Sequence, residues 1–419
     1  MLSKLLDKRF LTLFDQMVFS GTNFLMTIML TQLCSPEEFG KYSLIFMLML
    51  FGLTPFRNFT VEAMMANPQR FEKREYLSTT LVISAFVSVF FGVILGVFLL
   101  MFGNQYEIEG SAWNIYLFCI SRYLIELGRG YFFTYSQPLF ALIIDVLSSL
   151  CLLILLSQNH VGSMNYIEVL HVMSVSYMLG FVLGMFIAKP IFKINMEALY
   201  ANLNFGKWLC FTGIFIWFNG NFLLLIASSL LGNFVAGAVR AINNLFGPIS
   251  ILFQTIENYI PVRAASLLGK DGHQKMLDYL VAQAKLTSLL FLPIFLLVSF
   301  GSGLIISALF GDSYLPYKAI IPFIILAQIF GFYVRYFNIA LRTLKHTLPI
   351  FLGYAITAIL SIATSQVLIE SFGFLGYGVG IILFQMVLIS FLFWRLRSYI
   401  NTLEASPKLT NSTLERTTS

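Results

Sequence analysis

The sequence predicts an all-α integral membrane protein of about twelve transmembrane helices, arranged as two six-helix lobes related by pseudo-two-fold symmetry. Of its 419 residues, 58% are hydrophobic and 11% are charged, whereas a soluble domain carries about 25% charged residues. Residues 78–102 and 376–394 hold no charged side chain, and about twenty apolar residues cross the roughly 30 Å of hydrocarbon in a bilayer. A bilayer therefore accounts for this composition better than a large soluble core does.

Apolar runs, punctuated by glycine, proline and charge clusters, define the individual spans. They cover residues 10–33, 39–64, 77–102, 112–136, 139–157, 168–188, 208–231, 234–260, 280–301, 316–340, 349–370 and 376–396. Residues 1–9 are polar and no small-residue cleavage site follows them, so we expect the first span to be retained as a signal anchor. An even number of spans puts both termini on one side of the membrane.

Positive charge marks alternate loops and so predicts the orientation. One set of connections, with the two termini, is rich in basic residues: Lys4, Lys8, Arg9, Arg70, Lys73, Arg74, Lys189, Lys193, Lys207, Arg263, Lys270, Lys275, Arg342, Lys345, Arg395, Arg397, Lys408 and Arg416. The opposite set holds Lys41 and Lys318 against the acids Glu37, Glu38, Glu107, Glu109, Glu168, Asp312 and Glu370. By the positive-inside rule, both termini are cytoplasmic. The net charge of +6 follows largely from these loops, so it is no evidence for nucleic-acid binding. It is compatible with membrane lipids as partners, through anionic headgroups at the inner leaflet.

The two halves of the chain echo each other. Residues 21–25 (GTNFL) are similar to residues 219–223 (NGNFL), and residues 50–52 with Pro55 are similar to residues 245–248 (LFGP). With six spans per half, such a repeat predicts two parallel lobes about an axis along the bilayer normal. We therefore expect an N-terminal lobe over 1–195 and a C-terminal lobe over 196–400. The Ser/Thr-rich residues 401–419 are expected to be a disordered cytoplasmic tail.

Cysteine and histidine residues predict neither a metal site nor a disulfide framework. The four cysteines stand singly, with no CxxC pair, and the four histidines have no metal-ligand spacing: Cys34, Cys119, Cys151, Cys210, His160, His171, His273 and His346. Ordinary packing or loop positions explain them better, and we expect no metal and no cofactor.

Charged residues inside the predicted spans are the candidates for function, because an Arg or Lys at the bilayer centre costs about 2.5–3.5 kcal/mol on insertion scales. In the fourth span, Arg122, Glu126 and Arg129 are spaced i, i+4 and i+7 and so share one helix face. A single ion pair would need one arginine. The second is therefore expected to meet another anion, either a ligand or Asp145 in the fifth span.

The second half carries polar residues of the same kinds. Arg240, Asn243 and Asn244 share one face of the eighth span, and Pro248 is expected to interrupt that helix as Pro55 interrupts the second. A cationic, amide-rich cavity of this kind would bind phosphate or pyrophosphate bidentately and contact sugar hydroxyls. The predicted substrate-binding residues are Arg122, Arg129, Arg240, Arg335, Asn219, Asn221, Asn244 and Asn338, of which Arg122 and Arg240 are the strongest. The alternative is that these residues pair internally and hold the helices together.

One motif resembles a known family. Asp15, Gln16 and residues 20–24 (SGTNF) lead to residues 35–43 (SPEEFGKYS), which is similar to the start of polysaccharide biosynthesis flippases of the multidrug/oligosaccharidyl-lipid/polysaccharide exporter superfamily. A Pro-Glu-Glu-Phe-Gly-x-Tyr-type turn follows the first helix in that family. Beyond residue 70 the resemblance lies in the architecture of twelve spans.

The resemblance implies a V-shaped pair of six-helix bundles in a bacterial inner membrane. Its cargo would be an undecaprenyl-pyrophosphate-linked O-antigen or capsule repeat unit, flipped from the cytoplasmic to the periplasmic leaflet by alternating access. Coupling to a proton or sodium gradient would fall to an intramembrane acid, with Glu126, Asp145 and Glu257 as the candidates. The alternatives are a multidrug exporter of the same superfamily and a membrane polysaccharide polymerase or ligase. The exporter would favour an acidic pocket, and the enzyme a large outer loop or an Asp-x-Asp motif.

Overall fold

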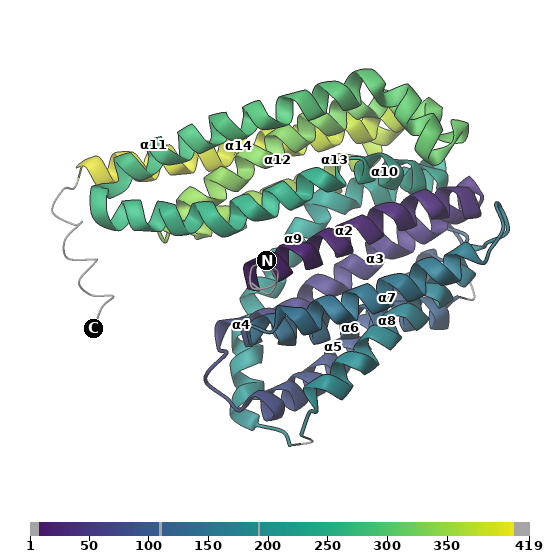
Figure 1. Ribbon diagram of the computed structural model, residues 1–419. Coiled ribbons are helices and arrows are strands. Elements are labelled where there is room, and N and C mark those ends of the chain that lie inside the picture. Colours follow the sequence, from purple (N-terminus) through teal and green to yellow (C-terminus); the bar gives the residue numbers. More distant parts are fainter. Residues whose placement is uncertain (1–7, 109–110, 192, 406–419) are drawn as a thin grey trace.

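The computed structural model describes residues 8–108, 111–191 and 193–405, apart from the side chains of residues 8–9, 248–259, 290 and 403–405. Within these residues the chain is almost entirely helical (Figure 1). The elements are α2 (Lys8–Leu33), α3 (Pro36–Phe59), α4 (Val61–Ala66), α5 (Lys73–Phe102), α6 (Ala112–Thr134), α7 (Pro138–Ser157), α8 (Tyr166–Ala188), α9 (Met196–Leu231), α10 (Phe234–Asn244), α11 (Gly247–Phe310), the 3-10 helix η1 (Asp312–Ile320), α12 (Ile321–Thr343), α13 (Leu348–Phe372) and α14 (Phe374–Ala405).

The predicted fold class is confirmed, and the helices follow the predicted spans with three breaks or bends and some longer ends. α9 begins at Met196, ahead of the predicted start at 208. α14 continues to Ala405, so residues 401–405 of the predicted tail are helical, and residues 406–419 lie outside the described residues. The second span is broken at Thr60, five residues after Pro55, so that α4 follows α3. The eighth span is broken at residues 245–246, and Pro248 stands in the first turn of α11 rather than inside a helix, where a missing N–H costs nothing. Gly272, with φ 84°, bends α11 into two arms that serve as parts of the eighth and ninth spans.

Hydropathy separates the helices into two groups. Among the described residues, nine helical segments are long and apolar enough to cross a bilayer. The first and fourth predicted spans, α2 and α6, are not among them. Both carry charged residues at membrane depth: Asp15 on α2, and Arg122, Glu126 and Arg129 on α6. The eighth runs through residues 248–259, whose side chains are not described. The two less apolar helices, α2 and α6, carry four of the charged residues of the candidate site.

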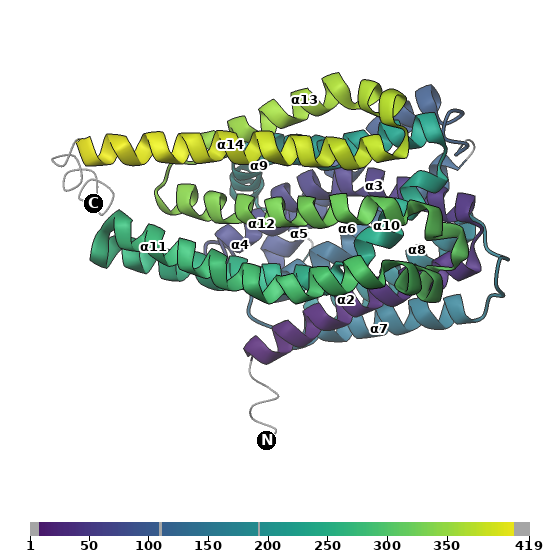
Figure 2. The same cartoon turned by 90° about the horizontal axis from the view of Figure 1, so that it is seen from above.

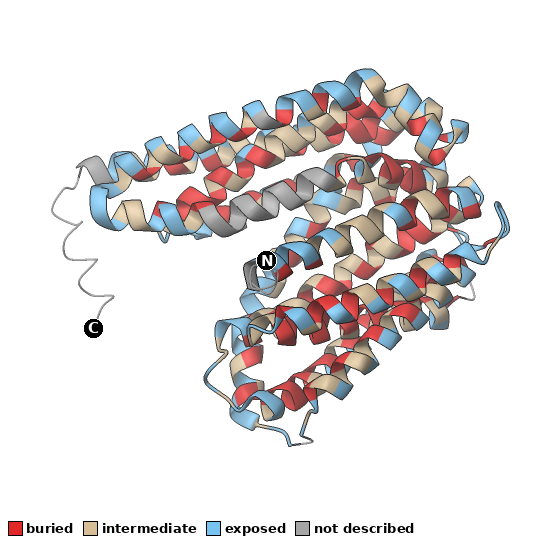
Figure 3. Ribbon diagram, viewed as in Figure 1, coloured by how far each residue is buried: buried red, intermediate tan, exposed pale blue. Residues whose placement is uncertain are grey.

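The helices form two lobes, seen one above the other in Figure 1. Buried residues gather where the helices face one another, and exposed residues lie on the outside (Figure 3). One lobe contains α2–α8 and the other α10–α14, and α9 packs against α3 on one side and α13 on the other. The start of α2 and the end of α14 lie at the same end of the molecule in two perpendicular views (Figures 1 and 2). This is the end that the loop charges predict to be cytoplasmic.

The lobes pack tightly at the opposite, predicted outer end. A Cβ atom added to Gly40 on α3 would lie 2.2 Å from the carbonyl oxygen of Asn233, just before α10. The Phe39 ring meets the Tyr314 ring of η1 edge-on at 6.3 Å, and the Asn233 amide donates to the Tyr106 carbonyl oxygen at 2.6 Å. A backbone approach this close requires glycine, so Gly40 sets the contact between the lobes.

Candidate functional site

Buried charges are concentrated in the N-terminal lobe. Glu126 on α6 is the centre of the group: its Oε1 lies 2.5 Å from Arg57 Nη1, and its Oε2 lies 3.0 Å from Arg122 Nη1 and 3.4 Å from Arg129 Nη1. Arg57 also reaches Glu62 on α4, at 2.8 Å. One carboxylate thus faces three guanidiniums, a geometry that compensates the cost of removing it from water.

Arg129 carries this network across to two other helices. Its Nη2 lies 3.1 Å from Asp15 Oδ2 on α2, and its Nε lies 2.7 Å from Asp145 Oδ2 on α7. Arg129, Asp15 and Asp145 are all at least nine-tenths buried. A single guanidinium therefore holds α2, α6 and α7 together, and we refer to Asp15, Arg57, Glu62, Arg122, Glu126, Arg129 and Asp145 as the charge cluster.

The charge cluster contains three arginines and four acids, so it carries one negative charge when every member is ionised. One more cation or proton would balance it. A cavity of about 30 Å³ adjoins Arg122, Arg129, Asp145 and Asn23, and a space of that size holds a water molecule or a small ion. A proton or a monovalent cation bound in this space would neutralise the cluster.

A second polar site lies between the two lobes and has a different character. It is a cavity of about 360 Å³ whose polar walls carry one arginine and several amides and hydroxyls. The polar lining residues are Asn23, Thr27, Ser43, Asn221, Arg240, Asn243 and Asn244. They come from α2 and α3 of one lobe, from α10 of the other, and from α9. We call this space the Arg240 cavity.

Arg240 makes contacts with aromatic rings instead of acids. Its guanidinium carbon lies 3.7 Å from the Phe46 ring centroid and 5.0 Å from that of Tyr42, and Nη2 donates to the Tyr42 hydroxyl at 3.2 Å. Its Nε is buried and has no hydrogen-bond partner among the described residues. No described carboxylate forms an ion pair with Arg240. A cation on aromatic faces keeps its full charge for an incoming anion.

The PEEFG segment explains how the chain builds this site. The Ser35 hydroxyl caps α3 by accepting from the Glu38 N–H, and Pro36 occupies the first turn. Counting onward from this fixed start, Gly40 reaches the other lobe, Tyr42 holds Arg240, and Ser43 lines the cavity. The motif therefore sets both the contact between the lobes at the predicted outer end and the position of Arg240.

The predicted site residues fall into three groups. The charge cluster contains Arg122, Arg129, Glu126 and Asp145. Both arginines contact carboxylates, and their substrate-binding role stays a prediction. Arg240, Asn221 and Asn244 line the Arg240 cavity. Asn219, Arg335 and Asn338 line neither this cavity nor the small one beside Asp145. The side chain of the predicted coupling residue Glu257 lies outside the described residues.

Several residues of these sites were not among the sequence candidates, including Asp15 and Asn23. Asp15 lies inside the first span and contacts Arg129, and Asn23 lines both the Arg240 cavity and the small cavity beside Asp145. The cost of an acid at membrane depth is a signal that could have found Asp15. The repeat had aligned Asn23 with Asn221, and both now line the same cavity.

The chain is similar in its arrangement of helices to several solved transporters. An inward-facing multidrug resistance MATE family transporter of the MOP superfamily matches with a TM-score of 0.72 at 12% identity, covering 93% of this chain and 96% of that one. The lipid II flippase MurJ in an inward closed conformation gives 0.65 at 13% identity, covering 93% and 87%. A MOP superfamily transporter from Pyrococcus furiosus, described as having a binding pocket of reverse polarity, gives 0.59 at 13%, covering 94% and 95%.

These likenesses define the class: the chain has the two-lobed fold of MOP superfamily transporters. The family model of the polysaccharide biosynthesis proteins matches residues 29–319, and the chain belongs to that family. No curated protein sequence matches it. The expected membership of the polysaccharide biosynthesis family is thereby confirmed, and the chain has the fold of multi-pass membrane transporters.

Proposed function

We propose that this protein flips a lipid-linked oligosaccharide, with an undecaprenyl-pyrophosphate carrier as the expected lipid, from the cytoplasmic to the periplasmic leaflet of a bacterial inner membrane. The observation that carries the proposal is Arg240, a guanidinium without a described carboxylate partner in an amide-lined cavity between two lobes. Such a group binds phosphate oxygens through paired N–H donors. The neighbouring amides offer donors and acceptors to sugar hydroxyls.

Alternating access supplies the route. The contacts between Gly40 and Asn233 and between Phe39 and Tyr314 close the predicted outer end, so this conformation is the one in which cargo enters from the cytoplasmic side. Movement of the cargo outward then requires these contacts to separate. Because they sit on the same stretch of α3 as Tyr42, opening the outer end also moves the partner of Arg240.

The charge cluster is the proposed site of ion coupling, with Asp15 added to the predicted acids Glu126 and Asp145. Its excess of one carboxylate takes up a proton or a sodium ion, and α2 links it to the cargo. Asn23 on α2 lines both cavities, and the Asn244 amide of the other lobe donates to the Phe24 carbonyl oxygen at 3.4 Å. A change of charge at Asp15 therefore acts on the Arg240 cavity through α2.

The polarity of the cavity separates this proposal from the two alternatives. A multidrug exporter for organic cations needs acids facing its cargo, whereas the described charged residue of this cavity is an arginine. A polymerase or ligase would leave single repeat units accumulating on the periplasmic leaflet when it is lost, whereas loss of a flippase leaves them on the cytoplasmic leaflet.

Deletion of the gene followed by leaflet-resolved analysis of the lipid-linked oligosaccharide tests the proposal. We expect cytoplasmic accumulation, restored to normal by the wild-type chain and by Arg263→Ala, which changes an exposed arginine of α11. Arg240→Gln should fail to restore it while reaching the membrane in normal amount. Periplasmic accumulation of single units in the deletion strain would refute the assignment as a flippase. Full complementation by Arg240→Gln would refute the cargo site at Arg240.

A further inference from the structure

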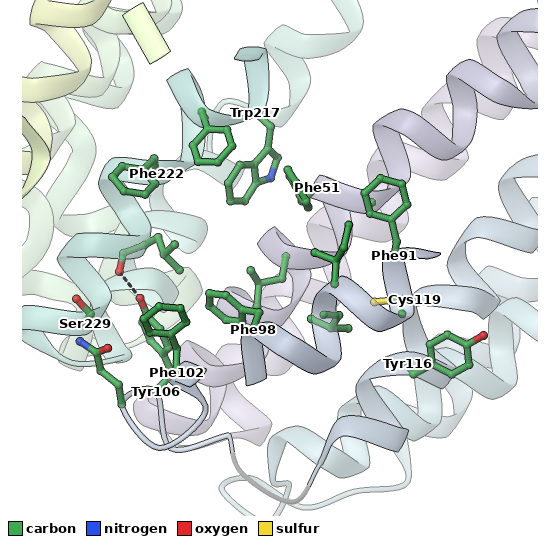
Figure 4. Close-up of a pocket in the computed structure, with 18 of the residues that line it drawn as sticks. Phe51, Phe91, Phe98, Phe102, Tyr106, Tyr116, Cys119, Trp217, Phe222 and Ser229 are labelled. Carbon is green, nitrogen blue, oxygen red and sulfur yellow. Dashed lines mark hydrogen bonds between the residues drawn. The ribbon is translucent and has the colours of Figure 1, made fainter. Parts of the chain in front are cut away.

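A third cavity, rich in aromatic side chains, lies away from Arg240. It has a volume of about 570 Å³ and lies among α3, α5, α6 and α9. Figure 4 shows aromatic side chains arranged around it, among them Phe51, Phe91, Phe98 and Trp217. We call it the lateral cavity.

The lateral cavity faces the region that lipid occupies. Its wall on α5 includes Ile94 and Phe102, which are themselves exposed, and the adjoining α5 residues Phe90 and Val97 are at least half exposed. Along α5 and α9, its lining residues occupy the halves of the helices nearer the predicted outer end. An apolar cavity that meets a bilayer fills with hydrocarbon, because water finds too few polar partners there and an unfilled wall loses dispersion contacts.

The polar groups of the cavity are gathered mainly at one end. Gln105 and Tyr106 follow α5, Ser229 stands in the last turn of α9, and Gln366 lies on α13. Figure 4 shows Phe102, Tyr106 and Ser229 close together at this end. The cavity thus has an apolar body and a polar cap at the predicted membrane surface, which matches one chain and the ester region of an outer-leaflet lipid.

Two helices, α3 and α9, separate the lateral cavity from the Arg240 cavity. The residues of α3 that line the lateral cavity are Leu48, Phe51 and Gly52, whereas Ser43, Phe46, Met47 and Leu50 line the Arg240 cavity on another face. The same division holds on α9, and the two cavities share no lining residue. The chain of a carrier lipid whose phosphate lies at Arg240 therefore has no direct path into the lateral cavity. This separation favours a membrane phospholipid as the occupant of the lateral cavity.

We propose that the lateral cavity binds one acyl chain of an outer-leaflet phospholipid, with the ester region at Gln105, Tyr106, Ser229 and Gln366. The bound chain fills the space between α5 of one lobe and α9, so it stabilises the arrangement in which the predicted outer end is closed. This inference goes beyond the proposed function and does not depend on the identity of the cargo.

Trp217 provides the probe. It lines the lateral cavity, is 7% exposed, and its indole N–H donates to the Met47 carbonyl oxygen at 3.1 Å. The other three tryptophans, Trp113, Trp208 and Trp394, are 66%, 71% and 58% exposed. A protein with these three changed to phenylalanine reports on the cavity alone, because bilayer chains reach Trp217 only by entering it.

The experiment places this protein in vesicles of phosphatidylethanolamine and phosphatidylglycerol whose acyl chains are brominated at mid-chain. We expect quenching of Trp217 fluorescence, reduced about twofold or more by the cavity-filling changes Ser88→Leu and Ile226→Phe. The matched control Val93→Leu changes a lipid-exposed position of α5 that does not line the cavity. It should leave quenching as in the parent protein.

Three results would overturn the inference. The first is no quenching in the parent protein, and the second is quenching in both cavity-filling variants as strong as in the parent protein. The third is quenching by brominated polyprenyl phosphate but not by brominated phospholipid. Arg240→Gln should quench as the parent does. Failure of quenching alongside normal transport would refute the lipid site alone, whereas failure of transport with normal quenching would refute the cargo site alone.

Discussion

The charge cluster and the Arg240 cavity place the same functional group in opposite situations. Arg129 contacts three carboxylates on three helices and is 7% exposed, whereas Arg240 stacks on Phe46 and Tyr42 and contacts no described carboxylate. The first arrangement holds helices together and stores charge, and the second leaves a cation for a ligand. An arginine at membrane depth is therefore not by itself a sign of cargo binding. Whether it is available to a ligand depends on whether its neighbours are carboxylates or aromatic rings.

The largest effect on stability should come from the charge cluster. Arg129→Ala leaves Asp15 and Asp145 buried without their cation, and breaking a buried pair in this way costs about 3–5 kcal/mol. We expect low membrane abundance and a reduced midpoint of thermal unfolding in detergent. Arg70→Ala is the matched control, because the Arg70–Glu197 pair is exposed on both sides and should cost under about 1 kcal/mol. Equal loss in the two variants would contradict the distinction between buried and exposed pairs.

The largest effect on transport should come from Arg240. Arg240→Gln removes a cation that stabilises the fold only through two aromatic contacts and one hydrogen bond, a loss of about 1–2 kcal/mol. Flipping in proteoliposomes should nevertheless fall about tenfold or more, since hydrogen bonds to charged groups contribute about 1.5–3 kcal/mol each. Full activity in this variant would remove the contrast between the two arginines.

The contact at the predicted outer end should have an intermediate effect. Gly40→Val places side-chain atoms where the Asn233 carbonyl lies, and overpacking of this kind costs about 1–3 kcal/mol. The cost falls on the outer-closed form, so labelling of Ser43→Cys from outside, in a protein free of its own cysteines, should rise about fivefold or more. Gly21→Val is the control, because a Cβ there meets no atom within 4 Å. Unchanged labelling would show that this contact does not gate the cavity.

The smallest effect concerns His346, in the loop between α12 and α13. Partial burial and the nearby Arg395 lower the pKa of His346, whose ring stacks on Tyr399 at 4.3 Å. A lowered pKa in the folded protein means that the unfolded chain binds more protons at His346 than the folded chain does. The contribution of His346 to stability is therefore present above about pH 6.5 and is lost as pH falls through the folded pKa. NMR titration of the ring should show this direction, and the thermal midpoint of His346→Phe should lack that pH dependence. A raised pKa of His346 would contradict this prediction. The pH dependence due to His346 is the baseline against which pH effects of the charge cluster are measured.

Sequence reasoning succeeded where spacing along one helix was enough. Arg122, Glu126 and Arg129 were placed on one face by their i, i+4, i+7 spacing, and they do meet. Asp145 was named as an alternative partner of the second arginine and lies 2.7 Å from it. The twelve spans followed from the length of hydrocarbon that each must cross.

Other contacts depend on how distant helices pack, which spacing does not determine. Arg57 reaches Glu126 across 69 positions, and Asp15 reaches Arg129 across 114. Arg240 and Arg122 looked equivalent in sequence because each is a cation in a span. In the structure, Arg122 contacts the Glu126 carboxylate of its own helix, whereas α3 brings the Tyr42 and Phe46 rings to Arg240.

The most direct test is the affinity of the purified protein for a pyrophosphate-bearing polyprenyl oligosaccharide in nanodiscs, compared between Arg240→Gln and Arg122→Gln. If the unmatched guanidinium receives the phosphate, Arg240→Gln raises the dissociation constant about tenfold or more, and Arg122→Gln in its folded fraction changes it little. Equal affinity in Arg240→Gln and the wild type, or a larger loss in Arg122→Gln, would contradict the account.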